Sequence, residues 1–164
     1  MNVRIESLKQ KHLVSLHHAV DVVAKERKYF VMTKAPELSD FNKLASESSK
    51  AKFPFYVACV NNKVVGWANV TKADGAGRKH VGDLGMGLLP KYRRKGLGSK
   101  LLTKALKHGF AKTKLLRIQL EVYTDNIPAI LLYTKIGFQY EGVKRKAVQI
   151  NGKYKDAVGM SIVR

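Results

Sequence analysis

Residues 93–99 read RRKGLGS and are the most informative segment of this sequence. It follows Pro90 and opens a run of apolar residues with helical spacing that continues to about Phe110. Gly96 and Gly98, separated by one residue, let the backbone turn tightly and direct successive N–H groups at one point. The N-terminus of a helix adds partial positive charge, so this stretch is typical of a turn that binds a pyrophosphate.

Two common nucleotide motifs do not account for this stretch. The P-loop pattern G-x-x-x-x-G-K-[ST] is absent from the sequence. Residues 85–90 read GMGLLP, which breaks the dinucleotide-binding pattern where its third glycine should stand. Taken by itself, residues 93–99 could also be a basic strand-to-helix turn without a ligand.

Outward from this stretch, the hydrophobic periodicity predicts a mixed α/β chain. Helices are expected over residues 11–29, 36–50, 97–110 and 127–136. Strands are expected over residues 3–7, 55–60, 64–70, 80–89, 115–123, 138–150 and 153–163. A loop is expected over 71–79, while Asn61-Asn62-Lys63 and Asn151-Gly152 predict hairpin turns.

A second motif follows the first after one helix and one strand. Residues 120–138 match L-E-V-x-x-x-N-x-x-A-x-x-L-Y-x-x-x-G-F. Together with R-x-x-G-x-G at residues 93–98, the chain resembles the GNAT superfamily of acyl-CoA-dependent N-acetyltransferases, most strongly over residues 80–142. The resemblance implies one domain over residues 1–164, with a mixed, mostly antiparallel central sheet of six to seven strands and helices on both faces. Residues 141–156 resemble the branch that acetylates amino acids and related small compounds.

The same resemblance implies acetyl-CoA as the co-substrate and assigns its binding residues. The turn would hold the pyrophosphate through its backbone amides, and the preceding strand would pair with the pantetheine arm. A bulge at Gly85 or Gly87 would splay the sheet and aim a backbone N–H at the thioester oxygen. The expected cofactor-binding residues are Met86, Gly87, Leu88, Arg93, Arg94, Lys95, Gly96, Leu97, Gly98, Ser99, Asn126 and Tyr133.

The resemblance also implies catalytic roles, and for Tyr133 and Asn126 a purely structural interpretation is open as well. Tyr133 would donate a proton to the departing thiolate, and a modest drop of its pKa from about 10 would bring it level with a thiol near 8.5. Otherwise Tyr133 packs on the sheet as an ordinary aromatic, and Asn126 is a helix N-cap. The general base is expected to be Glu121, then Asp83, then Glu26. A carboxylate lies about 6 pKa units below an amine, so burial or a relaying water must help it.

The acceptor amine would attack the thioester directly while both substrates are bound. The first two helices are expected to shape its site through Glu26, Arg27 and Tyr29. By position, Trp67 and Asn69 are candidates to line it, although Trp67 could equally be a core residue. An amino acid or similar small amine is favoured. The alternative within the class is a protein N-terminal or lysine acetyltransferase.

The net charge of the chain suggests an alternative function that is not enzymatic. The chain holds 31 Lys and Arg against 12 Asp and Glu, a formal net charge of +19. Such a field attracts anions and could mark a basic nucleic-acid-binding module. No reading helix or stacking platform of aromatics supports that alternative, so nucleic acid is disfavoured as a partner. The charge also argues against a polycationic acceptor.

Composition limits the remaining possibilities. One cysteine, Cys59, cannot form an internal disulfide or a cysteine-rich metal site, and the adjacent His17 and His18 point apart on a helix. We therefore expect no metal. No apolar run is long enough to span a membrane, and residues 1–7 lack the apolar segment of a secretory signal, so a cytoplasmic protein is expected. Its partner would be a small-molecule amine, with a homodimer left open.

Overall fold

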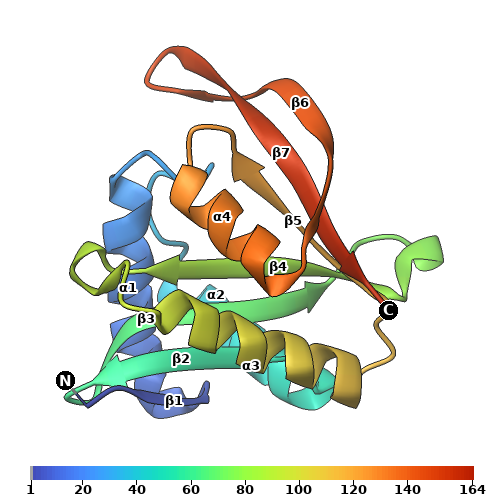
Figure 1. Cartoon of the computed structure of the whole chain (residues 1–164). Coiled ribbons are helices and arrows are strands. Elements are labelled where there is room, and N and C mark those ends of the chain that lie inside the picture. The colour runs from blue at the N-terminus through green and yellow to red at the C-terminus, as the bar shows by residue number, and fades with distance from the viewer. Residues whose placement is uncertain (1) are drawn as a thin grey trace.

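Seven strands form one sheet in the order β1-β2-β3-β4-β5-β7-β6 (Figure 1). The computed structural model describes residues 2–164, apart from the side chains of residues 48 and 51. The strands are β1 (Arg4–Ser7), β2 (Phe55–Val60), β3 (Lys63–Lys72), β4 (Val81–Leu88), β5 (Arg117–Tyr123), β6 (Gln139–Ile150) and β7 (Lys153–Val163). Neighbouring strands are antiparallel except β4 and β5, which are parallel. The predicted mixed, mostly antiparallel sheet is confirmed.

Helices cover both faces of this sheet, as predicted (Figure 1). They are α1 (Leu13–Lys25), α2 (Leu38–Ala51), α3 (Leu97–Lys112) and α4 (Ile127–Ile136). Successive residues of a strand point to opposite faces. In β2, Val57 belongs to the core formed with α1 and α2, and the next residue, Ala58, belongs to the core formed with α3. The α4 residue Tyr133 shares a core with Leu102 of α3, so these two helices lie on the same face.

The predicted hairpins are confirmed, and two predicted boundaries are wrong. Asn61 and Asn62 both have positive φ, as do Asn151 and Gly152, which is the backbone of a tight hairpin turn. The helix predicted over residues 11–29 begins as a 3-10 turn and ends at Lys25, because the backbone at Arg27 adopts a left-handed φ of 54°. The loop predicted over 71–79 starts too early, since β3 continues to Lys72.

The sheet opens between its two parallel strands. β4 and β5 pair only at Val81↔Arg117, Gly82↔Ile118 and Asp83↔Gln119, although β4 runs on to Leu88 and β5 to Tyr123. β5 then pairs over its whole length with β7 on its other side. Beyond Asp83 the facing edge of β4 therefore has no strand partner within residues 2–164, and Figure 1 shows the two strands diverging.

The predicted bulge in β4 is wrong. The register between β3 and β4 runs without a shift from Gly66↔Leu88 to Lys72↔Gly82. The sheet opens because β5 turns away after Gln119, and no extra residue in β4 is needed. The register shifts of the β2–β3 and β6–β7 pairs lie elsewhere, near Ala58 and Gly142.

Candidate active site

The basic turn lies at the N-terminus of α3, beside the end of β4. Arg94 and Gly96 have positive φ, 56° and 73°, and Gly96 is the N-cap residue of α3. Nothing lies within 4 Å of a Cβ added at Gly96, so its glycine is needed for backbone conformation and not for space. No side chain caps this helix end. The first N–H groups of α3 are therefore left for an anion.

Gly98 serves the turn in a different way. A Cβ added there would lie 3.1 Å from Leu132 of α4 and 3.4 Å from Leu88 of β4. The missing side chain thus lets α3 approach both neighbours closely. Arg94 and Lys95 are exposed on the outer side of the turn. A backbone cradle with two exposed cations suits a pyrophosphate, and the residues present fit the expected co-substrate.

Two glycines of β4 face side chains of the neighbouring strand β3 at close distance. A Cβ at Gly87 would lie 2.4 Å from the Trp67 indole, and one at Gly85 would lie 2.9 Å from Oδ1 of Asn69. Both are directly paired positions of β3 and β4. Trp67 is 5% exposed and belongs to the core beneath α1. The two glycines therefore leave room for the Trp67 and Asn69 side chains, which lie directly over the β4 backbone.

Asn126 and Tyr133 lie on the other side of the opening, at α4. Asn126 is the N-cap residue of α4, but its side chain makes no capping hydrogen bond. That amide stays available for a ligand. Tyr133 is 8% exposed and packs against Phe138, with ring centroids 5.7 Å apart. Burial raises the pKa of Tyr133, opposite to the modest drop that the sequence argument invoked. The hydroxyl stays protonated at neutral pH, and the raised pKa makes it a weaker acid than the sequence argument assumed.

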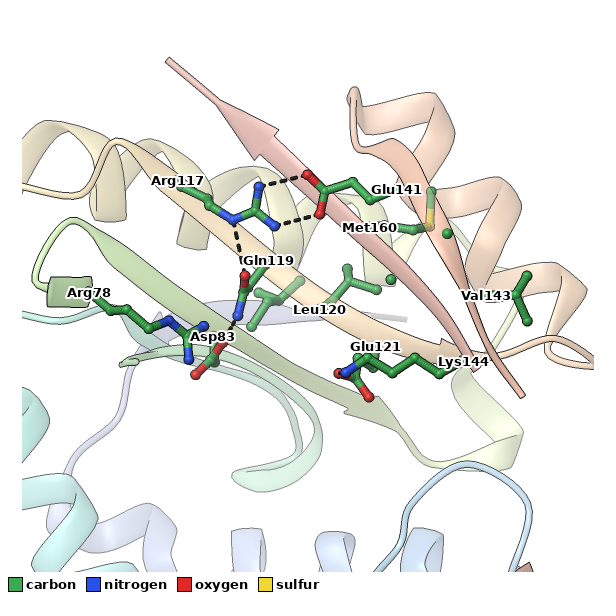
Figure 2. Close-up of a pocket in the computed structure, with 13 residues that line it drawn as sticks. Arg78, Asp83, Arg117, Gln119, Leu120, Glu121, Glu141, Val143, Lys144 and Met160 are labelled. Carbon is green, nitrogen blue, oxygen red and sulfur yellow. Dashed lines mark hydrogen bonds and ion pairs between the residues drawn. The ribbon is translucent and has the colours of Figure 1, made fainter. Parts of the chain in front are cut away.

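A cavity of about 750 Å³ lies against β4, β5, β6 and β7 (Figure 2). Its β5 residues Arg117, Gln119 and Glu121 alternate with Ile118, Leu120 and Val122, which belong to the core below α3 and α4. The cavity thus occupies mainly the opposite face of the sheet. It begins where β4 and β5 are still paired and extends toward the opening.

A chain of hydrogen bonds crosses the paired end of the strands (Figure 2). Arg117 binds both carboxylate oxygens of Glu141, and its Nε donates to Gln119 Oε1 at 3.0 Å. The amide of Gln119 then donates to Asp83 Oδ1 at 2.8 Å. The Arg117 guanidinium and the Ser161 hydroxyl lower the pKa of Glu141 to about 2. This chain links β6, β5 and β4 at the last paired register.

The charges around the cavity are mostly matched within the protein. Arg117 pairs with Glu141, and Lys144 pairs with Glu121. Glu121, whose side chain is 52% exposed, is thus an ion-paired surface carboxylate. Arg78, on the short 3-10 turn before β4, has no acidic partner within residues 2–164 and lies near Asp83 in Figure 2.

The expected acceptor residues Glu26, Arg27 and Tyr29 do not line this cavity. Glu26 forms a two-pronged ion pair with Arg93, and the Tyr29 ring lies 4.8 Å from the guanidinium carbon of Arg93. Arg27 is exposed in the left-handed turn that follows α1. Arg93, expected to bind the cofactor, therefore contacts Glu26 and Tyr29, both expected to bind the acceptor.

Sequence reasoning missed Arg78, Arg117, Gln119 and Glu141. The alternation of Arg117, Gln119 and Glu121 along one strand is a readable signal for a polar face on β5. Glu141 had no such signal, because its partner Arg117 is brought close only by the pairing of β5 and β6 with β7.

One cluster outside the cavity has metal-ligand chemistry. Glu6, His12 and Cys59 place ligand atoms within 4.8 Å of one another. His12 Nδ1, however, accepts a hydrogen bond from the Lys9 backbone N–H at 3.0 Å. A metal at Nε2 would put the imidazole proton on Nδ1, against that donor. Burial also lowers the pKa of His12. We interpret the cluster as a neutral, buried histidine in the core, and the residues do not fit a metal ion.

Comparison with known proteins agrees with this geometry. The model of the acetyltransferase (GNAT) family matches residues 19–138. The L-amino acid N-acetyltransferase AaaT of Escherichia coli K12 is 34% identical over 108 residues, covering 66% of this chain and 67% of that protein. The spermidine N(1)-acetyltransferase of the same strain is 37% identical over 73 residues, 44% of this chain and 39% of that protein.

A solved structure extends the likeness to the whole chain. The crystal structure of a GNAT acetyltransferase from Streptococcus pneumoniae is similar with a TM-score of 0.92 and 26% identity, covering 99% of this chain and 100% of that one. The chain therefore belongs to the GNAT acetyltransferase family and is an N-acetyltransferase that uses acetyl-CoA. No helix among the described residues is long and apolar enough to cross a membrane.

Proposed function

We propose that this enzyme transfers the acetyl group of acetyl-CoA to the primary amine of a small acceptor that also carries a carboxylate, an amino acid or a close relative. The observation that carries this proposal is the opening of the sheet beyond Asp83 and Gln119, between the turn at residues 93–99 and the charged cavity. One side of the opening suits acetyl-CoA and the other suits the acceptor, so the amine can attack the thioester directly.

Acetyl-CoA would bind along the unpaired edge of β4. The pyrophosphate would lie at the N-terminus of α3, with Arg94 and Lys95 beside it. The pantetheine arm would pair with the backbone of residues 86–88, and the Asn126 side chain would bind the cofactor from α4. A backbone N–H of β4 near Met86 would then face the thioester oxygen and stabilise the oxyanion.

Two kinds of group on this chain would move protons. As the amine nitrogen bonds to the carbonyl carbon, the bond from carbon to sulfur breaks and the buried Tyr133 hydroxyl protonates the departing thiolate. The amine proton would leave toward Glu121 or Asp83. Glu121 is ion-paired with Lys144, and Asp83 accepts a hydrogen bond from Gln119. The transfer would therefore run through water in the open cavity.

Charge in the cavity favours a zwitterionic acceptor. Asp83, which forms no ion pair within residues 2–164, attracts the ammonium of the incoming amine. Arg78 is the lining cation without an acidic partner within residues 2–164, and a guanidinium binds a carboxylate with two parallel hydrogen bonds. A polyamine would place a second positive charge near Arg78 and gain no such contact. These residues support an amino acid over spermidine.

The test pairs each L-amino acid of a panel with its amide, which lacks the carboxylate, and includes spermidine. CoA release is followed with acetyl-CoA as donor. We expect kcat/KM to be about 10–100-fold higher for the preferred amino acid than for its amide. That ratio corresponds to the free energy of a hydrogen bond to a charged group. Arg78→Met should bring that ratio close to one, whereas Lys79→Met, a neighbouring exposed lysine, should leave it unchanged. Preference for the amide or for spermidine would contradict the proposal.

A further inference from the structure

Arg93, the first residue of the basic turn, uses four of its five guanidinium N–H donors on acceptors within the protein. Arg93 Nε donates to the Leu88 carbonyl at 2.9 Å, and Nη1 donates to Glu26 Oε2 at 2.9 Å and to the Tyr29 hydroxyl at 3.4 Å. Nη2 pairs with the other oxygen of Glu26. Each guanidinium nitrogen thus has a protein acceptor, and one carboxylate neutralises the charge.

These contacts join three segments that are far apart in the sequence. Glu26 follows the last residue of α1, Leu88 ends β4, and Arg93 begins the turn that leads to α3. The ion pair is half-buried, with side chains 25% and 21% exposed. A planar guanidinium held on both edges restrains position and direction, which a point charge cannot do.

A second contact ties the same segment to β4. Phe30, four residues after Glu26, packs against Trp67 with ring centroids 6.0 Å apart. The Trp67 indole covers Gly87, one residue before Leu88. The chain after α1 is therefore attached to the end of β4 by an ion pair and by an aromatic contact.

We propose that Glu26 and Arg93 form a clamp that shapes the turn for acetyl-CoA, and that Arg93 is a positioning residue and not a phosphate ligand. The clamp fixes the end of β4 and the start of the turn in one geometry, so the backbone amides of residues 96–99 converge before the ligand arrives. The exposed Arg94 and Lys95 then supply the cations that contact phosphate. The inference rests on the proposed placement of acetyl-CoA at this turn.

The clamp and the simpler electrostatic account predict opposite signs for one substitution. Glu26→Gln removes a negative charge from the neighbourhood of a polyanionic ligand. If Arg93 bound phosphate and Glu26 only competed for it, this change would strengthen acetyl-CoA binding. If the pair shapes the turn, the same change weakens binding, because a glutamine has one acceptor oxygen and cannot accept from both Nη1 and Nη2 of Arg93.

The experiment measures the dissociation constant of acetyl-CoA by isothermal titration calorimetry, below the unfolding midpoint of every variant. For Glu26→Gln we expect an increase of about tenfold, the loss of one charge-assisted hydrogen bond. Arg93→Lys should lose as much affinity as Arg93→Met. Lysine binds phosphate well, but its single ammonium cannot reproduce the planar guanidinium contacts to Glu26 and Leu88. Glu37→Gln, which removes the same charge at an exposed site, should leave affinity unchanged or slightly tighter.

Kinetics separates positioning from general damage. The clamp predicts that Glu26→Gln raises the KM for acetyl-CoA while kcat stays within about threefold, since the proton donor Tyr133 is untouched. Unchanged or tighter binding in Glu26→Gln, or wild-type affinity in Arg93→Lys, would overturn the inference. A wild-type protein that fails to bind acetyl-CoA would instead overturn the proposed placement of acetyl-CoA itself.

Discussion

The two ends of the parallel pair β4–β5 differ in how completely the protein satisfies its own polar groups. At the paired end, Glu141, Arg117, Gln119 and Asp83 form a continuous chain of hydrogen bonds. At the open end, the edge of β4 has no strand partner within residues 2–164, and the N-terminus of α3 has no side-chain cap. The paired end therefore has the features of a structural contact between strands, and the open end has those of a binding site.

This contrast shows why Arg117 and Glu141, at the paired end, are poor candidates for chemistry. Unpaired backbone polar groups are costly unless water or a ligand satisfies them, so a fold leaves them open only where that partner is available. Arg117 and Glu141 are held by each other, and the pKa of Glu141 is lowered accordingly. Their role is to hold the strands together where the opening begins.

The largest effect should come from the proton donor at the open end. Tyr133→Phe removes the hydroxyl while keeping the aromatic ring that packs against Phe138. We expect kcat to fall by about 10²–10⁴-fold, with acetyl-CoA affinity retained. Steady-state kinetics and calorimetry measure the two quantities. Tyr154→Phe, an exposed tyrosine on β7, is the matched control. An unchanged kcat in Tyr133→Phe would remove Tyr133 from the reaction.

A smaller effect should follow from the backbone of the turn. Gly96→Val places a branched side chain at φ 73°, which costs roughly 1–2 kcal/mol and shifts the N–H groups at the start of α3. We expect acetyl-CoA to bind about tenfold or more weakly. Gly77→Val, at a glycine without positive φ and with nothing within 4 Å, should leave binding unchanged. Wild-type affinity in Gly96→Val would show that the turn does not bind the ligand.

The smallest effect should come from the paired end and should appear in stability, not in cofactor binding. Glu141→Gln removes a carboxylate whose pKa is about 2 in the folded state, against an ordinary value of 4.5. Because the folded pKa is depressed, the stabilisation is present above pH 4.5 and is lost as pH falls toward 2. The side chain is 40% exposed, so solvent screening limits the loss at pH 7 to below about 1 kcal/mol.

Urea unfolding at pH 7 and near pH 2.5 measures this loss. Wild type and Glu141→Gln should differ at pH 7 and converge at the lower pH, while both bind acetyl-CoA alike at pH 7. A difference that grows as the pH falls would reverse the assigned sign. Weaker binding of acetyl-CoA in Glu141→Gln would show that the two ends are not independent.

Most elements could be predicted from the sequence because their signals are local. The bounds of α4 are those predicted, since Asn126, Pro128 and Gly137 mark its start and end. The helix after Leu13 was predicted too long, because its apolar spacing continues past the left-handed turn at Arg27, which leaves no mark in the pattern.

The site was only partly predictable, because much of it depends on strand order. The turn at residues 93–99 is contiguous, so its motif is readable. The opening of the sheet was expected from a β4 bulge, yet it arises where β5 leaves β4 to pair with β7, a long-range event. The pairing of Arg93 with Glu26, 67 residues away, likewise has no local signal.

The central claim is that acetyl-CoA binds at the open end of the β4–β5 pair. Thermal unfolding at low and at high salt, with acetyl-CoA or with ATP as an anionic control, tests it most directly. At about 100 times its Kd, a ligand adds roughly 2.7 kcal/mol, or about 5–10 °C in Tm for a chain of this size. At high salt we predict that shift for acetyl-CoA and none for ATP, and its loss in Gly96→Val. Equal shifts for both ligands that vanish with salt would contradict the claim, because charge would then account for the binding.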